Sequence, residues 1–305
     1  MNNMNQSQNK PIKSGIVTLV GPPNTGKSTL LNALLNQKIS IVSPKPQTTR
    51  NRILGIVNAP DYQIVLLDTP GLHHSECPLN QEMVKTAMDT MGEVDIIVFM
   101  IDATAHLPKG KAAPTKYLAG VKSTPAFLLI NKIDLIDKEK ILPLINTYTA
   151  LYNFKAIIPI SALKRQGLDL LIDELRRNLP EGPRYYPEDI PTDATERFIV
   201  EEIIREKVFL LTSKEVPYST AVQVEQFKEN SERRLTTIHA SIIIEKKSQK
   251  GIIIGKGGKK LGQIGTSARI DIEKLLNQKV MLKLWVKVKK NWTQNPGILK
   301  EFGFG

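Results

Sequence analysis

One short segment has the spacing of a phosphate-binding loop. It reads Gly21-Pro22-Pro23-Asn24-Thr25-Gly26-Lys27-Ser28, which matches G-x-x-x-x-G-K-[ST]. In such a loop, backbone N–H groups surround the phosphates of a nucleotide and the lysine reaches the β and γ oxygens. An apolar run at 16–20 precedes the loop, and leucines on one helical face follow it. A helix that starts there directs its free N–H groups and its positive dipole end at the phosphates, so we predict a nucleoside triphosphate site.

A second polar segment, Asp68-Thr69-Pro70-Gly71, follows an apolar strand at 64–67. Asp68 is therefore expected at the edge where α/β sheets bind ligands. We predict a Mg²⁺ site in which Ser28 is a direct ligand and Asp68 is an outer carboxylate, because Mg²⁺ keeps several waters and takes few protein ligands. The backbone N–H of Gly71 can approach the γ-phosphate. Without the upstream loop, a tight turn would be the preferred interpretation.

Two further segments indicate which base is bound. Asn131-Lys132-Ile133-Asp134 follows the predicted strand 126–130, and Ser161-Ala162-Leu163 follows the predicted strand 157–160. A carboxylate at Asp134 can accept from two N–H groups of guanine, a pair that adenine does not offer, and the second segment's backbone could contact the guanine O6. Alone, the first segment would be interpreted as a helix N-cap. Together, at successive strand ends, they predict guanine.

Composition limits the class of protein. The chain has 305 residues, enough for two domains, and one cysteine, Cys77, which excludes a disulfide framework and fits a reducing, cytosolic setting. Its N-terminus lacks the apolar region of a signal peptide, and its longest apolar run, 96–101, is far too short to span a membrane. We therefore expect a cytoplasmic protein, and we expect a monomer.

The positive charge is concentrated at one end. Of the net charge of +12, residues 246–305 carry +11, from 14 Lys/Arg against 3 Asp/Glu. A concentrated basic segment is typical of a surface that binds nucleic acid or anionic lipid.

The chain divides into two parts at a proline-rich segment. From 16 to 179, apolar strands alternate with helical patterns, which predicts a doubly wound α/β sheet. Four prolines between 180 and 191 then favour an extended linker. We predict a disordered N-terminus at 1–13, a nucleotide-binding GTPase domain at 14–180, a linker at 181–192 and an RNA-binding domain with a C-terminal tail at 193–305.

The second part has the element order of an RNA-binding fold. Its pattern is α-β-β-α-β, with a Gly255-Lys256-Gly257-Gly258 turn before the second long helix. In a KH domain, such a G-x-x-G turn clamps the backbone of about four nucleotides. The motif alone is usually a flexible turn, but here it lies inside the basic segment, with Lys259 and Lys260 following it. A short helix near 251–255 predicts the type II KH variant, an α+β fold.

The motifs together resemble those of a known family. The five consensus regions of a translation-factor-class GTPase correspond to Gly21–Ser28, Thr48-Thr49, Asp68–Gly71, Asn131–Asp134 and Ser161-Ala162. The stretch from Lys38 to Arg50 and the C-terminal domain resemble, more narrowly, the Era family of ribosome-assembly GTPases. The resemblance implies a GTPase with a type II KH domain that binds 16S rRNA near its 3′ end during maturation of the 30S subunit.

The resemblance also implies roles for single residues. A threonine of the first switch, Thr48 or Thr49, completes the Mg²⁺ shell, and we favour Thr49. Asn24 matches an asparagine associated with stimulation by K⁺, with a simple turn residue as the alternative. Leu72 stands where Ras-like proteins carry the glutamine that orients water, so slow intrinsic hydrolysis is expected. His73 and His74 are candidate bases, although such a pair is more often solvated surface.

The expected sites are therefore as follows. The catalytic group comprises Lys27, Asn24, Thr49 and Gly71, and the metal group comprises Ser28, Thr49 and Asp68. GTP or GDP, with Mg²⁺ and K⁺, is expected to bind Gly21, Pro22, Asn24, Thr25, Gly26, Lys27, Ser28, Thr29, Asp68, Thr69, Pro70, Gly71, Asn131, Lys132, Asp134, Ser161, Ala162 and Leu163. RNA is expected to bind Gly255, Lys256, Gly257, Gly258, Lys259 and Lys260.

Two other functions remain open at this point. One is a peripheral membrane GTPase whose basic segment docks on anionic lipid at the inner face of the cell membrane. The folded α-β pattern of 246–305 disfavours it, because lipid-binding segments are typically amphipathic helices. The other is a nucleotide-dependent metabolic enzyme, which is disfavoured because no second constellation of His, Cys or paired carboxylates is evident in the sequence.

Overall fold

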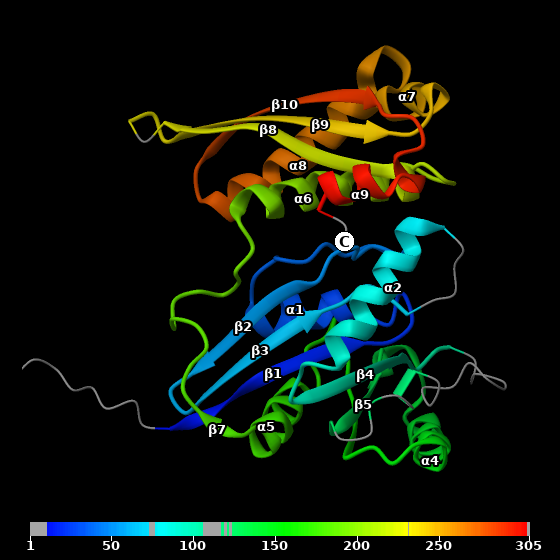
Figure 1. Ribbon diagram of the computed structural model, residues 1–305, viewed down its shortest axis with the longest axis vertical. Helices are drawn as coiled ribbons and strands as arrows, with labels where there is room; N and C mark the ends of the chain where they lie inside the picture. The colour runs from blue at the N-terminus through cyan, green and yellow to red at the C-terminus, as the bar shows by residue number, and fades with distance from the viewer. Residues whose placement is uncertain are drawn as a thin grey trace, which may run out of the picture.

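The computed structural model describes residues 11–72, 77–105, 117–118, 121, 124–230 and 232–303. Within these ranges the chain forms two units, each built on its own β-sheet (Figure 1). The predicted α/β unit followed by an α+β unit is confirmed.

The first unit is a mixed, mainly parallel sheet with the strand order β2-β3-β1-β4-β5-β6. Strand β2 is antiparallel to β3, and the short strand β7 is antiparallel to the start of β1. The strands are β1 (Ile12–Val20), β2 (Ile53–Ala59), β3 (Tyr62–Asp68), β4 (Ile96–Asp102), β5 (Ala126–Asn131), β6 (Ala156–Pro159) and β7 (Glu181–Gly182).

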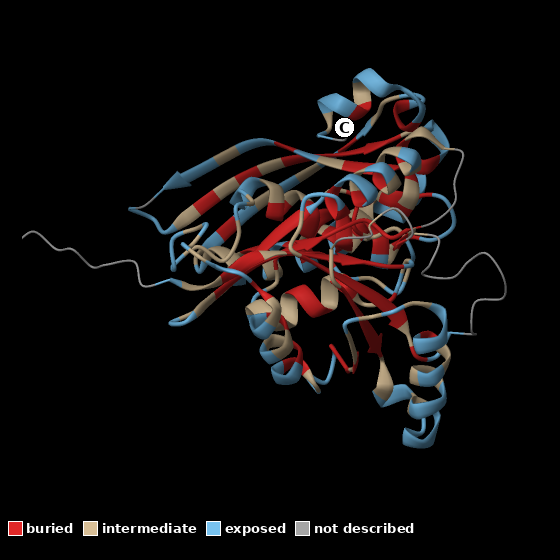
Figure 2. Cartoon of the chain, turned by 60° about the horizontal axis from the view of Figure 1, so that its bottom comes forward, coloured by how far each residue is buried: buried red, intermediate tan, exposed pale blue. Residues whose placement is uncertain are grey.

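Helices cover both faces of this sheet. They are α1 (Lys27–Leu35), α2 (Pro78–Met91), α4 (Ile141–Leu151) and α5 (Leu168–Asn178). Along β4, alternate residues enter different cores: Val98 packs with the leucines of α1 and α5, whereas Phe99 packs with α2 and α4. Figure 2 shows the resulting buried strands. This alternation is the physical reason for a doubly wound sheet.

The start of the first unit differs from the expected boundary. β1 begins at Ile12, within the segment predicted as an N-terminal tail, because Ile12 pairs with Gly182 and Lys13 pairs with Glu181. The beginning of the predicted linker therefore forms a strand. Residues 1–10 of the predicted tail lie outside the described residues. The division into domains stays a prediction at the level of single residues.

The second unit is a three-stranded sheet with the order β10-β9-β8 and helices packed against it. Strands β8 and β9 are antiparallel, and β9 and β10 are parallel. In chain order the elements are α6 (Glu196–Leu211), β8 (Thr220–Asn230), β9 (Leu235–Ile244), α7 (Lys247–Ile254), α8 (Lys259–Leu276) and β10 (Lys279–Val288). This is the order expected for the type II KH variant, with α7 as the predicted short helix.

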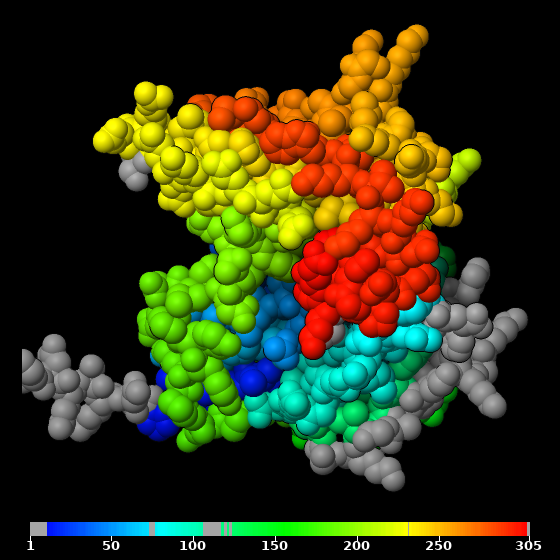
Figure 3. Space-filling model, turned by 45° about the horizontal axis from the view of Figure 1, so that its top comes forward, coloured from blue at the N-terminus to red at the C-terminus, as the bar shows by residue number. Residues whose placement is uncertain are grey.

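The C-terminal tail packs between the two units. It contains the short helix α9 (Pro296–Glu301), and Trp292 before it is fully buried. Leu79 and Met83 of α2 share an apolar cluster with Trp292 and Leu299. Figure 3 shows the tail, in red, against both α2 and the second unit. Burial of Trp292 makes it a packing anchor rather than an exposed stacking platform.

Candidate functional site

The phosphate-binding loop joins β1 to α1 and depends on glycine at two positions. Gly21 and Gly26 have φ of +145° and +98°, which side chains with a Cβ rarely adopt. A Cβ at Gly21 would also collide with the backbone oxygen of Met100, and one at Gly26 with the side-chain nitrogen of Asn131. The motif's glycines are therefore required by the close approach of neighbouring strand ends.

Lys27 is held inside this loop. Its Nζ donates to the backbone oxygens of Gly21 and Pro22, each at 3.1 Å, and the residue is only 6% exposed. Burial lowers the pKa of Lys27 to about 8, and the nearby carboxylate of Asp68 opposes this shift. A buried ammonium that has only carbonyl partners would gain strongly from phosphate oxygens.

Three oxygen-bearing side chains meet at the start of α1. Ser28 Oγ donates to Asp68 Oδ2 at 2.7 Å and lies 2.7 Å from Thr49 Oγ1. Thr49 Oγ1 lies 3.4 Å from the same Asp68 oxygen, whereas the hydroxyl of Thr48 donates to the backbone oxygen of Lys45. The geometry thus supports Thr49, rather than Thr48, as the threonine of the metal site.

Asp68 is fully buried and incompletely satisfied. Its Oδ1 has no hydrogen-bond partner among the described residues, while Oδ2 also accepts from Ser40 Oγ at 2.9 Å. Burial raises the pKa of Asp68, and the hydrogen bond from Ser28 and the charge of Lys27 oppose the rise. An orphaned buried carboxylate oxygen beside two hydroxyls suits a hard cation, so the donor set fits Mg²⁺.

The predicted base-binding segments are tied to the loop by one side chain. Asn131 Nδ2 donates to the backbone oxygen of Thr25 at 2.7 Å, and Asn131 Oδ1 accepts from the backbone N–H of Ala162 at 2.9 Å. Lys132 Nζ pairs with Asp102 Oδ2 at 2.5 Å. Asp134 is exposed and lines the pocket. Asn131 therefore braces three segments, and Asp134 is accessible to a ligand.

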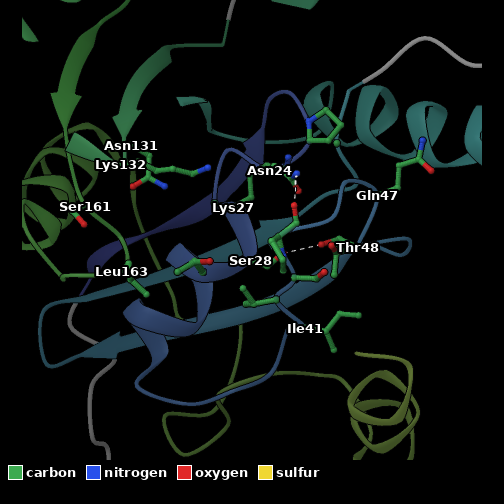
Figure 4. Close-up of a pocket in the computed structure, with 18 of the residues that line it drawn as sticks. Asn24, Lys27, Ser28, Ile41, Gln47, Thr48, Asn131, Lys132, Ser161 and Leu163 are labelled. Atoms are coloured by element: carbon green, nitrogen blue, oxygen red, sulfur yellow. Dashed lines mark hydrogen bonds between the residues drawn. The ribbon is translucent and has the colours of Figure 1, made fainter. Parts of the chain in front are cut away.

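These segments enclose one cavity of about 370 Å³, a size in the usual range for small-ligand sites. In Figure 4, Asn131, Lys132 and Ser161 gather at one end of the pocket. Asn24, Ser28 and Thr48 lie at the other end, with Lys27 between the groups. The arrangement provides separate places for a base and for phosphates.

The cavity does not expose every predicted residue. The predicted residues that line it are Asn24, Gly26, Lys27, Ser28, Thr29, Thr49, Gly71, Asn131, Lys132, Asp134, Ser161 and Leu163. The predicted residues outside its lining are Gly21, Pro22, Thr25, Asp68, Thr69, Pro70 and Ala162. All of these except Pro22 are buried.

Other residues that form the cavity belong to no sequence motif. Residues 41–44 and Gln47 line the cavity, and Asp102 holds Lys132. For residues 41–44, the only signal in the sequence was the family resemblance over 38–50, because these residues form no motif of their own. His73 and His74, the candidate bases, lie outside the described residues.

Asn24 and Leu72 are two described positions for which the sequence predicts an effect on the rate of hydrolysis. Asn24 has φ of +62°, and its Nδ2 donates to the backbone oxygen of Pro44 at 2.8 Å, which links the loop to 41–48. Leu72 is 3% exposed and its N–H donates to the backbone oxygen of Gly21. The side chain of Leu72 is apolar, so it cannot orient a water molecule as the glutamine at this position of Ras-like proteins does.

The G-x-x-G turn is the second candidate site. Gly255, Gly257 and Gly258 have φ of +70°, +60° and +78°, so the turn's shape favours glycine at three positions. A Cβ on Gly255 would also lie 2.8 Å from Lys260 Cβ. Lys256 is exposed beside them.

A groove continues from this turn between α8 and β10. It has a volume of about 610 Å³ and is lined by Gly258, Leu261, Gly262, Gly265, Thr266, Arg269, Val280, Met281, Leu282 and Leu284. Gly262 and Gly265 leave the face of α8 open, and Arg269 adds a cation. An apolar floor beside a basic turn suits unstacked nucleotides. Apart from Gly258, these positions were predicted only as parts of a helix and a strand.

Comparison with known proteins decides the family. The model of a family described as 50S ribosome-binding GTPase matches residues 16–132, and that of the KH domain matches 215–293. GTPase Era of Syntrophus aciditrophicus is 50% identical over 297 residues, covering 96% of this chain and 95% of that protein. GTPase Era of Geobacter metallireducens is also 50% identical, covering 96% and 98%. This chain belongs to the Era GTPase family.

Solved Era structures have the same overall arrangement. One, of Aquifex aeolicus Era bound to GDP and AlF₄⁻, has a TM-score of 0.92 at 40% identity and covers 96% of this chain and 100% of that one. Another Era, in complex with MgGDPNP and nucleotides 1506–1542 of 16S ribosomal RNA, has a TM-score of 0.92 at 41% identity and covers 96% and 99%. Within the part that our structure describes, no helix is long and apolar enough to cross a membrane.

Proposed function

We propose that this chain is a GTP-hydrolysing switch that binds 16S rRNA near its 3′ end through its KH domain and acts in maturation of the 30S subunit. The observation that carries the proposal is that one chain combines the guanine-type pocket and the basic G-x-x-G groove in the arrangement of the Era complex with MgGDPNP and 16S rRNA. The nucleotide supplies the switch and the groove supplies RNA binding.

Each side chain of the nucleotide pocket has a proposed role in binding GTP or Mg²⁺. Lys27 holds the β and γ oxygens, and the N–H groups of the loop and of Gly71 surround the phosphates. Ser28 and Thr49 would hold Mg²⁺ directly and Asp68 from outside, and the ion would neutralise charge that develops on the phosphates. Asp134 accepts from guanine, and Asn131 keeps that segment in register with the loop.

We propose K⁺ as a further cation, next to Asn24. The Nδ2 of Asn24 is committed to Pro44, which leaves its amide oxygen as the atom to face a cation beside the phosphates. Positive charge there would stabilise the charge that develops during transfer. The same contact couples the cation to the segment that carries Thr49.

RNA binding is proposed for the turn and for the groove behind it. Lys256, Lys259 and Lys260 supply positive charge, while the glycines allow the phosphate backbone to approach closely. Arg269 and the apolar floor would receive the bases.

We also propose a monomer in the cytoplasm. Contact of the basic segment with anionic lipid is testable by flotation with phosphatidylserine vesicles.

Substitution of Lys27 tests the proposal. Lys27→Ala should abolish measurable GTP turnover and weaken GTP binding strongly, because Lys27 is the only basic residue in the loop 21–28. The circular dichroism spectrum should be unchanged, since the side chain contacts loop carbonyls rather than the core. Lys155→Ala, an exposed lysine in the same domain, is the matched control. Retained turnover in Lys27→Ala would contradict the proposed site.

A further inference from the structure

The segment 38–50 connects the nucleotide pocket to the KH domain. Its pocket side contributes Thr49, and its other side contacts α6. The backbone N–H of Val42 donates to Glu206 Oε1 at 3.0 Å, and Lys45 Nζ donates to the backbone oxygens of Phe209 and Thr212. The segment is therefore fixed to α6 at several points along its length.

Two arginine contacts flank Thr49 itself. Arg205 of α6 donates from Nη2 to the backbone oxygen of Thr48 at 2.6 Å. On the other side, Arg50 donates to three KH-domain backbone oxygens, those of residues 217, 218 and 220, at 3.2, 2.7 and 2.7 Å. The residue with the metal-site hydroxyl is thus held immediately before and immediately after its own position. We call these two contacts the Thr49 clamp.

Both arginines are rigidly placed. Arg205 is 3% exposed, and its Nε and Nη2 donate to the two carboxylate oxygens of Glu202, each at 2.6 Å. Arg50 is 4% exposed, and its guanidinium lies 5.9 Å from the ring of Phe209 and 5.8 Å from that of Trp292. A buried cation strongly resists loss of its hydrogen-bond partners, so the clamp favours a single position of Thr49.

We propose that Arg50 and Arg205 are positioning residues for GTP hydrolysis, which set the Thr49 hydroxyl at the metal site through contacts with the KH domain. The inference rests on the proposed function. It means that α6 and the loop after it complete the hydrolytic arrangement of the GTPase domain. A displacement of the KH domain would then alter the position of Thr49 through these contacts.

A double-mutant cycle tests the clamp. Arg205→Lys keeps a cation beside Glu202 but cannot fork to Thr48 as well, and Arg50→Lys cannot reach three carbonyls. Each should lower kcat about tenfold, the loss expected for one charge-assisted hydrogen bond. GDP affinity should stay within about twofold, because switch contacts of this kind depend on the γ-phosphate. Arg197→Lys, at an exposed position of α6, is the control and should leave kcat unchanged.

The decisive arm adds Thr49→Ala. If the arginines act through Thr49, neither lysine substitution should lower kcat further in the Thr49→Ala background. Additive losses, or an unchanged kcat in both lysine variants, would overturn the clamp while leaving the proposed function intact. Absence of GTP turnover by the unmodified protein would overturn the function and the inference together. The melting temperature of each variant reports whether it folds. If Arg205→Lys melts at a clearly lower temperature than the unmodified protein, the test is made with Arg50→Lys.

Discussion

Replacement of Asp134 by Asn should change which nucleotide the chain prefers. Asp134 is exposed and lines the pocket, as Lys132 and Leu163 also do. Its carboxylate is therefore hydrated before a ligand binds, and each hydrogen bond to guanine replaces one to water. The net gain of each charge-assisted bond is then at the low end of its usual range, about 1.5 kcal/mol.

Two such bonds amount to about 3 kcal/mol, so Asp134→Asn should weaken GTP binding about 150-fold. Xanthine carries a carbonyl oxygen where guanine has its amino group, and the new amide can donate to it. Xanthosine triphosphate should consequently bind the variant better than it binds the unmodified protein. Titration calorimetry measures the affinity of both proteins for GTP and for xanthosine triphosphate.

The matched control is Asp137→Asn, an exposed carboxylate three residues further on that does not line the cavity. Its GTP affinity should be unchanged. A loss of less than threefold in Asp134→Asn, or ATP binding as tight as GTP binding in the unmodified protein, would refute the assignment of the base site.

Three further outcomes are expected. GTP turnover should be faster in KCl than in matched NaCl, and equal rates would reduce Asn24 to a turn residue. Burial raises the pKa of Glu201 to about 7, above its unfolded value, so its contribution to stability is complete below about pH 4.5 and is lost between pH 4.5 and 7. The loss is at most about 3 kcal/mol, reduced by the side chain's partial exposure, and Glu201→Gln should flatten urea stability against pH over this window; an unchanged slope would argue against it. Trp292→Ala should lower the free energy of unfolding by about 3–5 kcal/mol, because a fully buried side chain is removed; a loss under 1 kcal/mol would show that the tail does not depend on it.

Much of the site was predictable because its chemistry is local in the sequence. The phosphate loop directly follows β1 and Asp68 is the last residue of β3, and parallel strands bring their carboxyl ends to one edge. The second long helix, α8, begins at Lys259 directly after the G-x-x-G turn, as predicted. Within these segments, residue type, spacing and element order all agree, which is the condition under which sequence patterns are most informative.

Other features of the structure are not predicted by any pattern in the sequence. Arg50 and Arg205 bind backbone carbonyls, which any residue type provides, so no pattern identifies their partners. β1 starts early because of a strand about 170 residues away in the sequence. The groove beside α8 depends on Gly262 and Gly265, which helical periodicity alone treats as neutral positions. In the first two cases the determining contact lies between segments that are distant in the sequence.

Nucleotide-loaded RNA binding tests the central claim most directly. The measurement is the affinity of the GDPNP-loaded protein for a labelled single-stranded oligonucleotide from the 16S rRNA 3′ end, as a function of salt. The substitution Lys256→Asp reverses the charge at the turn and leaves its three positive-φ glycines in place. Lys155→Asp changes the charge by the same amount on the exposed surface of the GTPase domain. RNA binding should be sensitive to salt, and its affinity should fall more than tenfold in the turn variant alone. Equal affinity of the turn variant, the control and the unmodified protein would contradict the claim.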